Sequence, residues 1–245
     1  MKQLKLKISQ SNNFANFLKK FSSIEAALLL ELDSTMLKAK THTPERSVVK
    51  YSSIPIDEIF SEHEITEEIK IGIHNIDKLA QAFKYFGEGE FDFIINVEKV
   101  QDQFVGTSIV MKNSSLDITF QCASLKIFTF ITDDILNKII NTENSEVDFL
   151  LPKEQQSKII SLFGIDTDYS KISFTIDNTS IIAKGKNFNY EISSDVRVDN
   201  NTEISVLKHH YVYLDREDSQ VYLVGDQLIL LSNESDTKLI IGQAE

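Results

Sequence analysis

The strongest constraint on the fold of this chain is an internal repeat. The stretches EEIKIGIHNIDKLAQAFKYFGEGEFDFIINV and SEVDFLLPKEQQSKIISLFGIDTDYSKISFTID each predict a strand, a short helix, an acidic turn and a second strand. Each helix is expected to end at a Phe-Gly pair, with Gly87 and Gly164 in the left-handed conformation that closes a helix. Asn75 fits a helix N-cap, and Pro152 fits a first helical turn. The repeat therefore predicts two similar halves.

Strand-forming residues fill most of the remaining chain. Segments rich in Ile, Val, Phe and Thr recur along its whole length, whereas helical periodicity is confined to short pieces. Besides the two helices of the repeat, we expect a helix at 11–22 and a weaker one at 205–214. This balance predicts an α+β protein in which each half places two short helices on mostly antiparallel sheets.

The length of 245 residues suits two domains of roughly 100 to 150 residues each. The polar stretch TDDILNKIINTENS interrupts the rhythm of strands and reads as a partly helical connector, with Asp133 and Asp134 in the first turn of its helix. We therefore expect domains at 1–125 and 147–245, joined by a connector at 126–146.

The sequence also bears on the cellular compartment. MKQLKLKI alternates polar and apolar residues like a strand, unlike a secretory signal, and no apolar run approaches the roughly 18 to 20 residues of a membrane-spanning helix. Cys122 is the only cysteine, which excludes an intramolecular disulfide and a multi-cysteine metal site. We expect a cytoplasmic protein without a membrane partner.

Charge is distributed unevenly between the helices and the rest of the chain. The formal net charge is -12, yet the four predicted helices carry seven lysines against only Asp77 and Glu154. In the first helix Phe14, Leu18 and Phe21 belong to one apolar stripe, which turns its lysines away from the core. The lysines of any single helix are explained as an ordinary solvent-exposed face. Four basic helices together, however, predict a surface that attracts the phosphates of a nucleic acid.

These features together resemble a known family. Two halves with two short helices each, a long connector and basic helices in an acidic chain look like a trimeric DNA sliding clamp of the kind found in eukaryotes, archaea and some tailed bacteriophages. The likeness to the bacteriophage clamps is closest in NNFANFLKKFSSIEAALLLELDSTMLKAK, IGIHNIDKLAQAFKYF and DTKLIIGQAE. The resemblance implies a processivity factor, a homotrimeric ring that encircles duplex DNA irrespective of sequence and tethers the DNA polymerase and the clamp loader. The lysines of the inner wall would be Lys19, Lys20, Lys78, Lys84, Lys153, Lys158 and Lys208.

The resemblance also implies two kinds of protein contact. Subunits of the ring would meet through the strands at 115–121 and 179–185, with the interface residues Leu116, Ile118, Phe120, Ile181, Ile182 and Lys184. Partner peptides would insert into a groove under the connector, lined by Leu32, Ile127, Phe128, Ile240 and Ile241. For each groove residue, an ordinary place in the core is an equally good interpretation.

An enzymatic role finds little support in the sequence. GEGE at 87–90 lacks the strand-to-helix context of a phosphate-binding loop, and ITFQCASL places Cys122 at the end of a strand. His209 and His210 are adjacent and lack the i, i+4 spacing of helical metal ligands, whereas His63 is expected to be solvated. We expect no catalytic residue, metal ligand or cofactor. The alternatives left open are a processivity subunit that binds DNA without encircling it, and a viral interaction scaffold with no DNA role.

Overall fold

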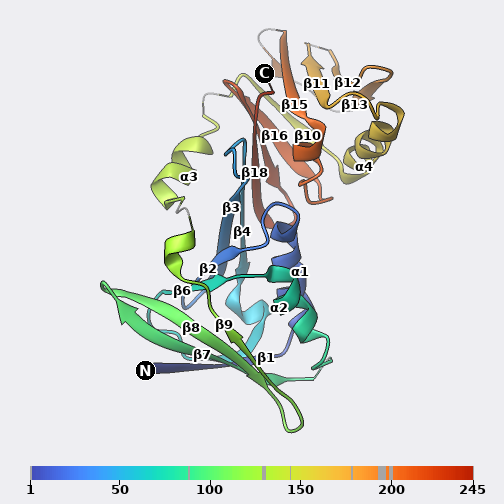
Figure 1. The fold of residues 1–245 in the computed structure, drawn as a ribbon. Helices are drawn as coiled ribbons and strands as arrows, with labels where there is room; N and C mark the ends of the chain where they lie inside the picture. The colour runs from blue at the N-terminus through green and yellow to red at the C-terminus, as the bar shows by residue number, and fades with distance from the viewer. Residues whose placement is uncertain are drawn as a thin grey trace. The chain divides into compact units, whose positions relative to one another are not determined.

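A computed structural model describes residues 2–87, 89–128, 131–143, 145–177, 179–192, 197–198 and 201–244. Its mixture of sheets and short helices confirms the predicted α+β class (Figure 1). The chain divides into two compact units. Unit 1 comprises Met1–Thr41 and Tyr51–Ile131, and unit 2 comprises His42–Lys50 and Thr132–Glu245. The sequence placed residues 42–50 in the first domain, whereas the structure groups them with the second.

Unit 1 is built on one twisted sheet. Its strands are ordered β4-β3-β2-β6-β8-β7-β1-β5, with β4 contributing its residues from Tyr51 onward, and β9 pairs with β8 outside this path. All the neighbours with a described register are antiparallel except β6 and β8, which are parallel. The elements are β1 (Lys2–Ile8), α1 (Ser11–Ser22), β2 (Leu28–Leu32), β3 (Met36–His42), β4 (Val48–Pro55), η1 (Ile56–Glu58), β5 (Phe60–His63), β6 (Ile69–Ile73), α2 (Ile76–Phe83), β7 (Phe91–Val100), β8 (Gln103–Lys112), β9 (Asp117–Gln121) and η2 (Leu125–Ile127).

The helices α1 and α2 lie beside each other on the core of unit 1 (Figure 1). The apolar stripe predicted for the first helix is buried, including Phe14 and Phe21. The ring of Phe14 lies 5.1 Å from that of Phe83 on α2 and 5.8 Å from that of Phe93 on β7. Because both helices bury one apolar face against the same sheet, their polar faces are left to the solvent.

Unit 2 contains two sheets. One has the strand order β14-β10-β16-β17-β18 and continues into the first residues of β4, and the other has the order β13-β12-β11-β15. The elements are α3 (Asp133–Ile139), β10 (Val147–Leu151), α4 (Lys153–Leu162), η3 (Phe163–Ile165), β11 (Lys171–Ile176), β12 (Ile181–Lys184), β13 (Asn189–Ile192), β14 (Arg197–Val198), β15 (Thr202–Leu207), α5 (Lys208–Tyr211), β16 (Ser219–Val224), β17 (Gln227–Ser232) and β18 (Asp236–Gly242).

The core of unit 2 forms around a buried tyrosine at the end of α5. The ring of Tyr211 packs 5.7 Å from that of Phe174 and 5.9 Å from that of Phe163. Burial raises the pKa of its hydroxyl far above the ordinary value, so this hydroxyl remains neutral. α5 is thus anchored to the sheet by the residue that ends it.

The signals for helix ends are confirmed in part. Asn75 caps α2 by accepting a hydrogen bond from the backbone N–H of Lys78 at 2.9 Å. Gly87 has the expected positive φ, +68°, but α2 ends before it, at Phe83. The prediction for Gly164 is wrong, because the turn η3 continues the chain past α4 without a positive φ at this residue. The helix predicted at 205–214 is also shorter than expected, since β15 extends to residue 207 by pairing with β11.

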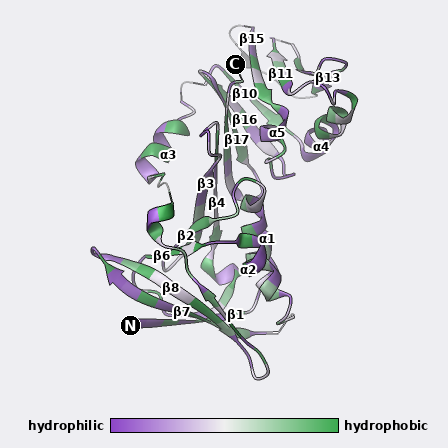
Figure 2. Cartoon of the chain, in the orientation of Figure 1, coloured by the Kyte–Doolittle hydropathy of each residue, from purple (hydrophilic) through white to green (hydrophobic). Residues whose placement is uncertain are grey.

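The helix predicted in the connector is present as α3. Thr132 caps it by accepting a hydrogen bond from the N–H of Ile135 at 3.2 Å, and Asp133 and Asp134 form its first turn as expected. Figure 2 shows that both α3 and α4 carry hydrophilic as well as hydrophobic residues. Within the described part of the chain, no helix has the length and apolar character needed to cross a bilayer.

Candidate nucleic-acid interface

The polar faces of α1 and α2 form the most basic surface of the four helices considered. Three lysines here are exposed: Lys19 on α1, Lys78 on α2 and Lys84 directly after α2. Lys20 on α1 is half-buried. α1 contains no acidic residue, and α2 contains only Asp77. These adjacent helices therefore present four ammonium groups and one carboxylate, in a chain that is acidic as a whole.

Lys78 owes its position to the N-terminal cap of α2. The side chain of Asn75 fixes the start of the helix through the N–H of Lys78, which places this lysine in the first turn. The N-terminal end of a helix carries a partial positive charge, which adds to that of the ammonium group. Directly after Lys84, the side chain of Tyr85 is 74% exposed. Both ends of α2 thus offer groups that suit a polyanion.

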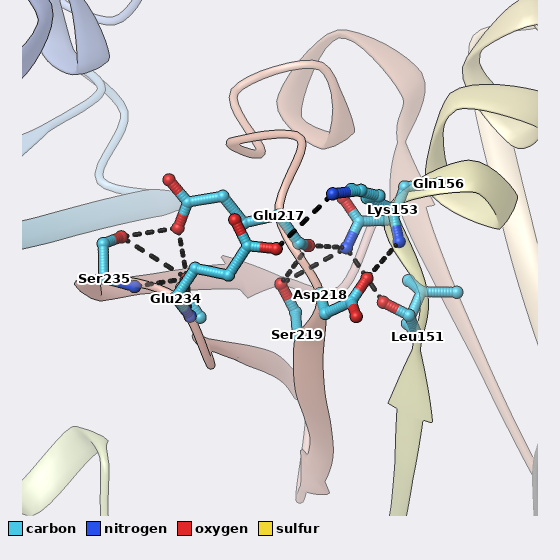
Figure 3. Close-up of polar contacts among 9 residues, drawn as sticks. Leu151, Lys153, Gln156, Glu217, Asp218, Ser219, Glu234 and Ser235 are labelled. Atoms are coloured by element: carbon cyan, nitrogen blue, oxygen red, sulfur yellow. Dashed lines mark hydrogen bonds and ion pairs between the residues drawn. The ribbon is translucent and has the colours of Figure 1, made fainter.

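The lysines of α4 lie close to carboxylates. Lys153 and Lys158 are exposed, as predicted, but Glu154 is exposed beside them. The ammonium of Lys153 also lies 3.7 Å from a carboxylate oxygen of Glu234 (Figure 3). Unit 2 therefore contributes a weaker basic face than unit 1.

A buried glutamine positions α4. Gln156 is fully buried, and its amide nitrogen donates to the carbonyl of Leu151 at 3.0 Å, to the hydroxyl of Ser219 at 3.3 Å and to the carbonyl of Glu217 (Figure 3). The sequence shows Gln155 and Gln156 where an apolar stripe is expected. The structure explains this departure, because the amide ties the helix to the strands beneath it.

The start of α4 is capped from outside the helix. Pro152 precedes α4 in an extended conformation and has no side-chain group that could cap it. Asp218 takes that role, since its carboxylate accepts a hydrogen bond from the backbone N–H of Lys153 at 2.8 Å (Figure 3). A carboxylate at this end of a helix is favourable for the helix dipole as well.

The prediction that Lys208 contacts DNA is wrong. Its side chain is buried, and its ammonium donates to the carbonyl of Asp166 at 2.8 Å and lies 4.0 Å from the carboxylate of the same residue. The rings of Phe163 and Tyr169 lie 5.4 and 5.8 Å from the ammonium. Because α5 is only four residues long and begins at Lys208, this residue faces the core where the helix leaves β15.

β9 has the free edge that the sequence predicts for the first interface strand. β9 pairs with β8 from Asp117 to Gln121, and no other strand partner is found for it among the described residues. Leu116, Ile118 and Phe120 are half-buried against the core of unit 1. Hydrogen bonds between the N–H of Asn113 and the carbonyl of Leu116, and between the N–H of Cys122 and the carbonyl of Thr107, anchor the ladder. By antiparallel alternation, the backbone groups of 117, 119 and 121 point to the free edge.

The edge position expected for the strand at 179–185 is wrong. β12 is paired on both sides, with β11 and with β13, so Ile181, Ile182 and Lys184 lie inside the four-stranded sheet. β13 (Asn189–Ile192) follows β12 in a hairpin and pairs with its open side. β13 is therefore the outer strand in the described part of this sheet. The hydrogen bond from the N–H of Gly185 to the carbonyl of Phe188 turns the backbone groups of Asn189 and Glu191 outward.

The predicted groove residues fall into two groups. Leu32, Ile240 and Ile241 are buried within their units, whereas Ile127 is 57% exposed and Phe128 is half-buried. The start of the connector is fastened to β6, since the N–H of Ala123 donates to the carbonyl of Gly72 at 2.8 Å. A Cβ at Gly72 would lie 2.5 Å from the carbonyl oxygen of Ala123, so this close contact requires glycine.

Comparison with protein-family models finds no match, and comparison with curated protein sequences finds none either. Solved structures do match. Proliferating Cellular Nuclear Antigen from Entamoeba histolytica superposes with a TM-score of 0.70 at 12% identity, covering 99% of each chain. The PCNA2-PCNA3 complex from Sulfolobus tokodaii matches with a TM-score of 0.66 at 14% identity, covering 98% of each chain. The chain therefore has the fold of these proteins over almost its whole length, and the clamp fold expected from the resemblance is confirmed.

Proposed function

We propose that this protein is a DNA sliding clamp, a processivity factor that encircles duplex DNA and holds replication proteins on it without catalysing a reaction. The observation that carries the proposal is the basic face of α1 and α2, with Lys19, Lys20, Lys78 and Lys84, on a clamp fold whose net charge is -12. Such a charge distribution favours phosphate contacts at this face and repels DNA elsewhere. The protein would act in the cytoplasm of a bacterium or of a bacteriophage-infected cell.

The helices favour sliding over tight binding. Lysine ammonium groups attract phosphates without reading bases, so the contacts are equivalent at every position along the duplex. The basic face of unit 2 is reduced to Lys153 and Lys158, and the first of these is paired with Glu234. A ring that is closed around DNA does not need strong contacts, because its topology prevents dissociation.

Ring closure is proposed to join two unpaired strand edges. β9 in unit 1 and β13 in unit 2 each present outward-facing backbone groups, and head-to-tail pairing of such edges between three copies gives a closed homotrimer. This assignment replaces β12 with β13 as the second interface strand. Partner peptides of the DNA polymerase and the clamp loader are proposed to dock near Ile127 and Phe128 at the start of the connector.

Encirclement is tested with a nicked circular duplex and the same duplex after linearisation. The loaded protein should remain on the circle and leave the linear form through its ends. Charge reversal of Lys19, Lys20, Lys78 and Lys84 to Glu should weaken DNA association and flatten its dependence on salt. Reversal of Lys5, Lys126, Lys138 and Lys186, which are exposed outside the four helices, is the matched control with the same change of charge. Equal effects of the two variants, or equal retention on both DNA forms, contradict the proposal.

Assembly is tested separately by analytical ultracentrifugation. The expected mass is three times the chain mass of 27.9 kDa. Thr119→Pro removes an outward backbone N–H from the edge of β9 and should yield monomers, whereas Thr119→Ala keeps this N–H and should leave the trimer intact. A Thr119→Pro protein that stays trimeric would show that β9 is not an interface strand.

A further inference from the structure

A cluster of two histidines and one glutamate lies in unit 2, apart from the surfaces considered above. Glu45 is at the tip of the hairpin between β3 and β4, and His209 and His210 are on α5. One potential metal-ligand atom from each of the three residues lies within 4.8 Å of the other two. Nε2 of His210 is 3.1 Å from the carboxylate of Glu45, and the two imidazole rings are 4.1 Å apart.

The surroundings of His210 hold its imidazole in place. Its side chain is only 1% exposed, and its ring lies 6.2 Å from that of Tyr213, with an angle of 28° between the ring planes. The next residue, Tyr211, is the buried anchor of α5. Nε2 also lies 3.2 Å from the hydroxyl of Ser47, whereas Nδ1 is buried and has no hydrogen-bond partner among the described residues. The ring is thus fixed but not fully satisfied by hydrogen bonds.

Glu45 contributes its carboxylate to the cluster from the hairpin between β3 and β4. Its carboxylate accepts a hydrogen bond from the hydroxyl of Ser47 at 2.8 Å. Glu45 and His209 are both exposed, so their side chains have room to adjust. The cluster therefore combines one fixed imidazole with a second imidazole and an anionic oxygen that can move toward it.

We propose that Glu45, His209 and His210 bind a divalent first-row transition metal ion of the Zn²⁺ type. Two imidazole nitrogens and one carboxylate oxygen are a donor set suited to Zn²⁺, whereas Mg²⁺ and Ca²⁺ prefer oxygen ligands alone. Metal-ligand distances of about 2.1 Å place tetrahedral ligand atoms about 3.4 Å apart. The carboxylate of Glu45 already lies 3.1 Å from Nε2 of His210, so the exposed side chain of His209 makes most of the adjustment. Water from the solvent takes the remaining coordination position.

The metal would join two segments that are distant in sequence. Glu45 and His210 are 165 residues apart, and the hairpin tip is already held by the hydrogen bond from the N–H of Gly242 to the carbonyl of Ser47 at 2.7 Å. Glu45, the third ligand, is far in sequence from the two adjacent histidines. For this reason the spacing of residues in the sequence does not predict the metal site. Metal bound here stabilises the folded form of unit 2, because the unfolded chain separates the ligands.

The test uses the full, untagged protein after treatment with a chelator. Zn²⁺ is titrated in competition with a chromophoric chelator, and Co²⁺ is added separately as a spectroscopic probe. We expect one Zn²⁺ per chain and a visible Co²⁺ band without a thiolate charge-transfer band. Glu45→Gln and His209→Asn should each reduce the affinity about tenfold or more, since even loss of a group that orients a ligand has effects of about 10- to 100-fold. Both residues are exposed, so these variants should fold.

Two controls separate this site from incidental binding. His63 lies 3.0 Å from the carboxylate of Asp57 in unit 1, so His63→Asn removes a histidine with a carboxylate neighbour and should leave the Zn²⁺ affinity unchanged. Cys122→Ser removes the only thiol and should also have no effect. Zn²⁺ should raise the melting temperature of the wild-type protein but not of the Glu45→Gln/His209→Asn variant. Absence of Zn²⁺ binding, or equal binding by wild type and this double variant, overturns the proposal.

Discussion

The buried amide of Gln156 gives the most direct test of how α4 is held in place. In Gln156→Met the side chain keeps its length and its helix propensity but loses the amide nitrogen that serves Leu151, Ser219 and Glu217. An amide has two hydrogens, so about two hydrogen bonds are lost at once, each with a net contribution of about 1 kcal/mol. The stranded carbonyl groups add to this loss.

One contribution has the opposite sign. Oε1 of Gln156 is buried without a hydrogen-bond partner among the described residues. Its removal therefore raises the free energy of unfolding by about 1 kcal/mol. We therefore expect Gln156→Met to lower the free energy of unfolding by about 2 kcal/mol, and Gln156→Ala to lower it further by leaving a cavity.

The measurement is urea denaturation followed by circular dichroism, together with hydrogen exchange of the amides at 153–162. Gln81→Met is the matched control, because it makes the same substitution at an exposed position of α2 and should change stability by less than about 0.5 kcal/mol. If Gln156→Met is as stable as the wild type, with unchanged protection of α4, the polar anchor does not hold this helix.

Three further changes have defined outcomes. Lys208→Met should lower the free energy of unfolding by about 3 kcal/mol, since it leaves a buried carboxylate without its cation, and should not change the salt dependence of DNA binding. Burial raises the pKa of Cys122 to about 12, so alkylation by iodoacetamide should be slow at pH 8. Because an unfolded thiol ionises near about 8.5, the stability of the wild type in urea should fall more steeply than that of Cys122→Ala as the pH rises above that value. Gly72→Ala should lower the free energy of unfolding by about 1 to 3 kcal/mol in urea denaturation, because its Cβ would lie 2.5 Å from the carbonyl oxygen of Ala123, whereas Gly89→Ala meets nothing within 4 Å and serves as the control.

The parts of the fold that depend on local patterns could be predicted from the sequence. The apolar stripe at 11–22 and the cap at Asn75 lie where the structure has α1 and the start of α2. Amphipathic periodicity and capping act over a few residues, so they are visible in one segment. The end of β15 was missed because Leu207 pairs with Lys171, a partner that no local pattern reveals.

The candidate site shows the same division. Lys19, Lys78 and Lys84 are exposed as predicted, since each lies opposite an apolar stripe. Lys208 was misplaced because its burial depends on Asp166, which is 42 residues away. β12 was taken for an edge because only the pairing of the following strand, β13, shows that it lies inside the sheet.

The path of the chain through unit 2 affects how this protein can be made and dissected. Residues 42–50 are synthesised long before their neighbour β18, because most of the described chain lies between them. A fragment beginning at the connector would lack the segment that covers one side of β18, and its exposed edge would favour aggregation. The two halves are therefore not separable by a single cut, and a two-piece expression strategy would require a circular permutant or a grafted hairpin.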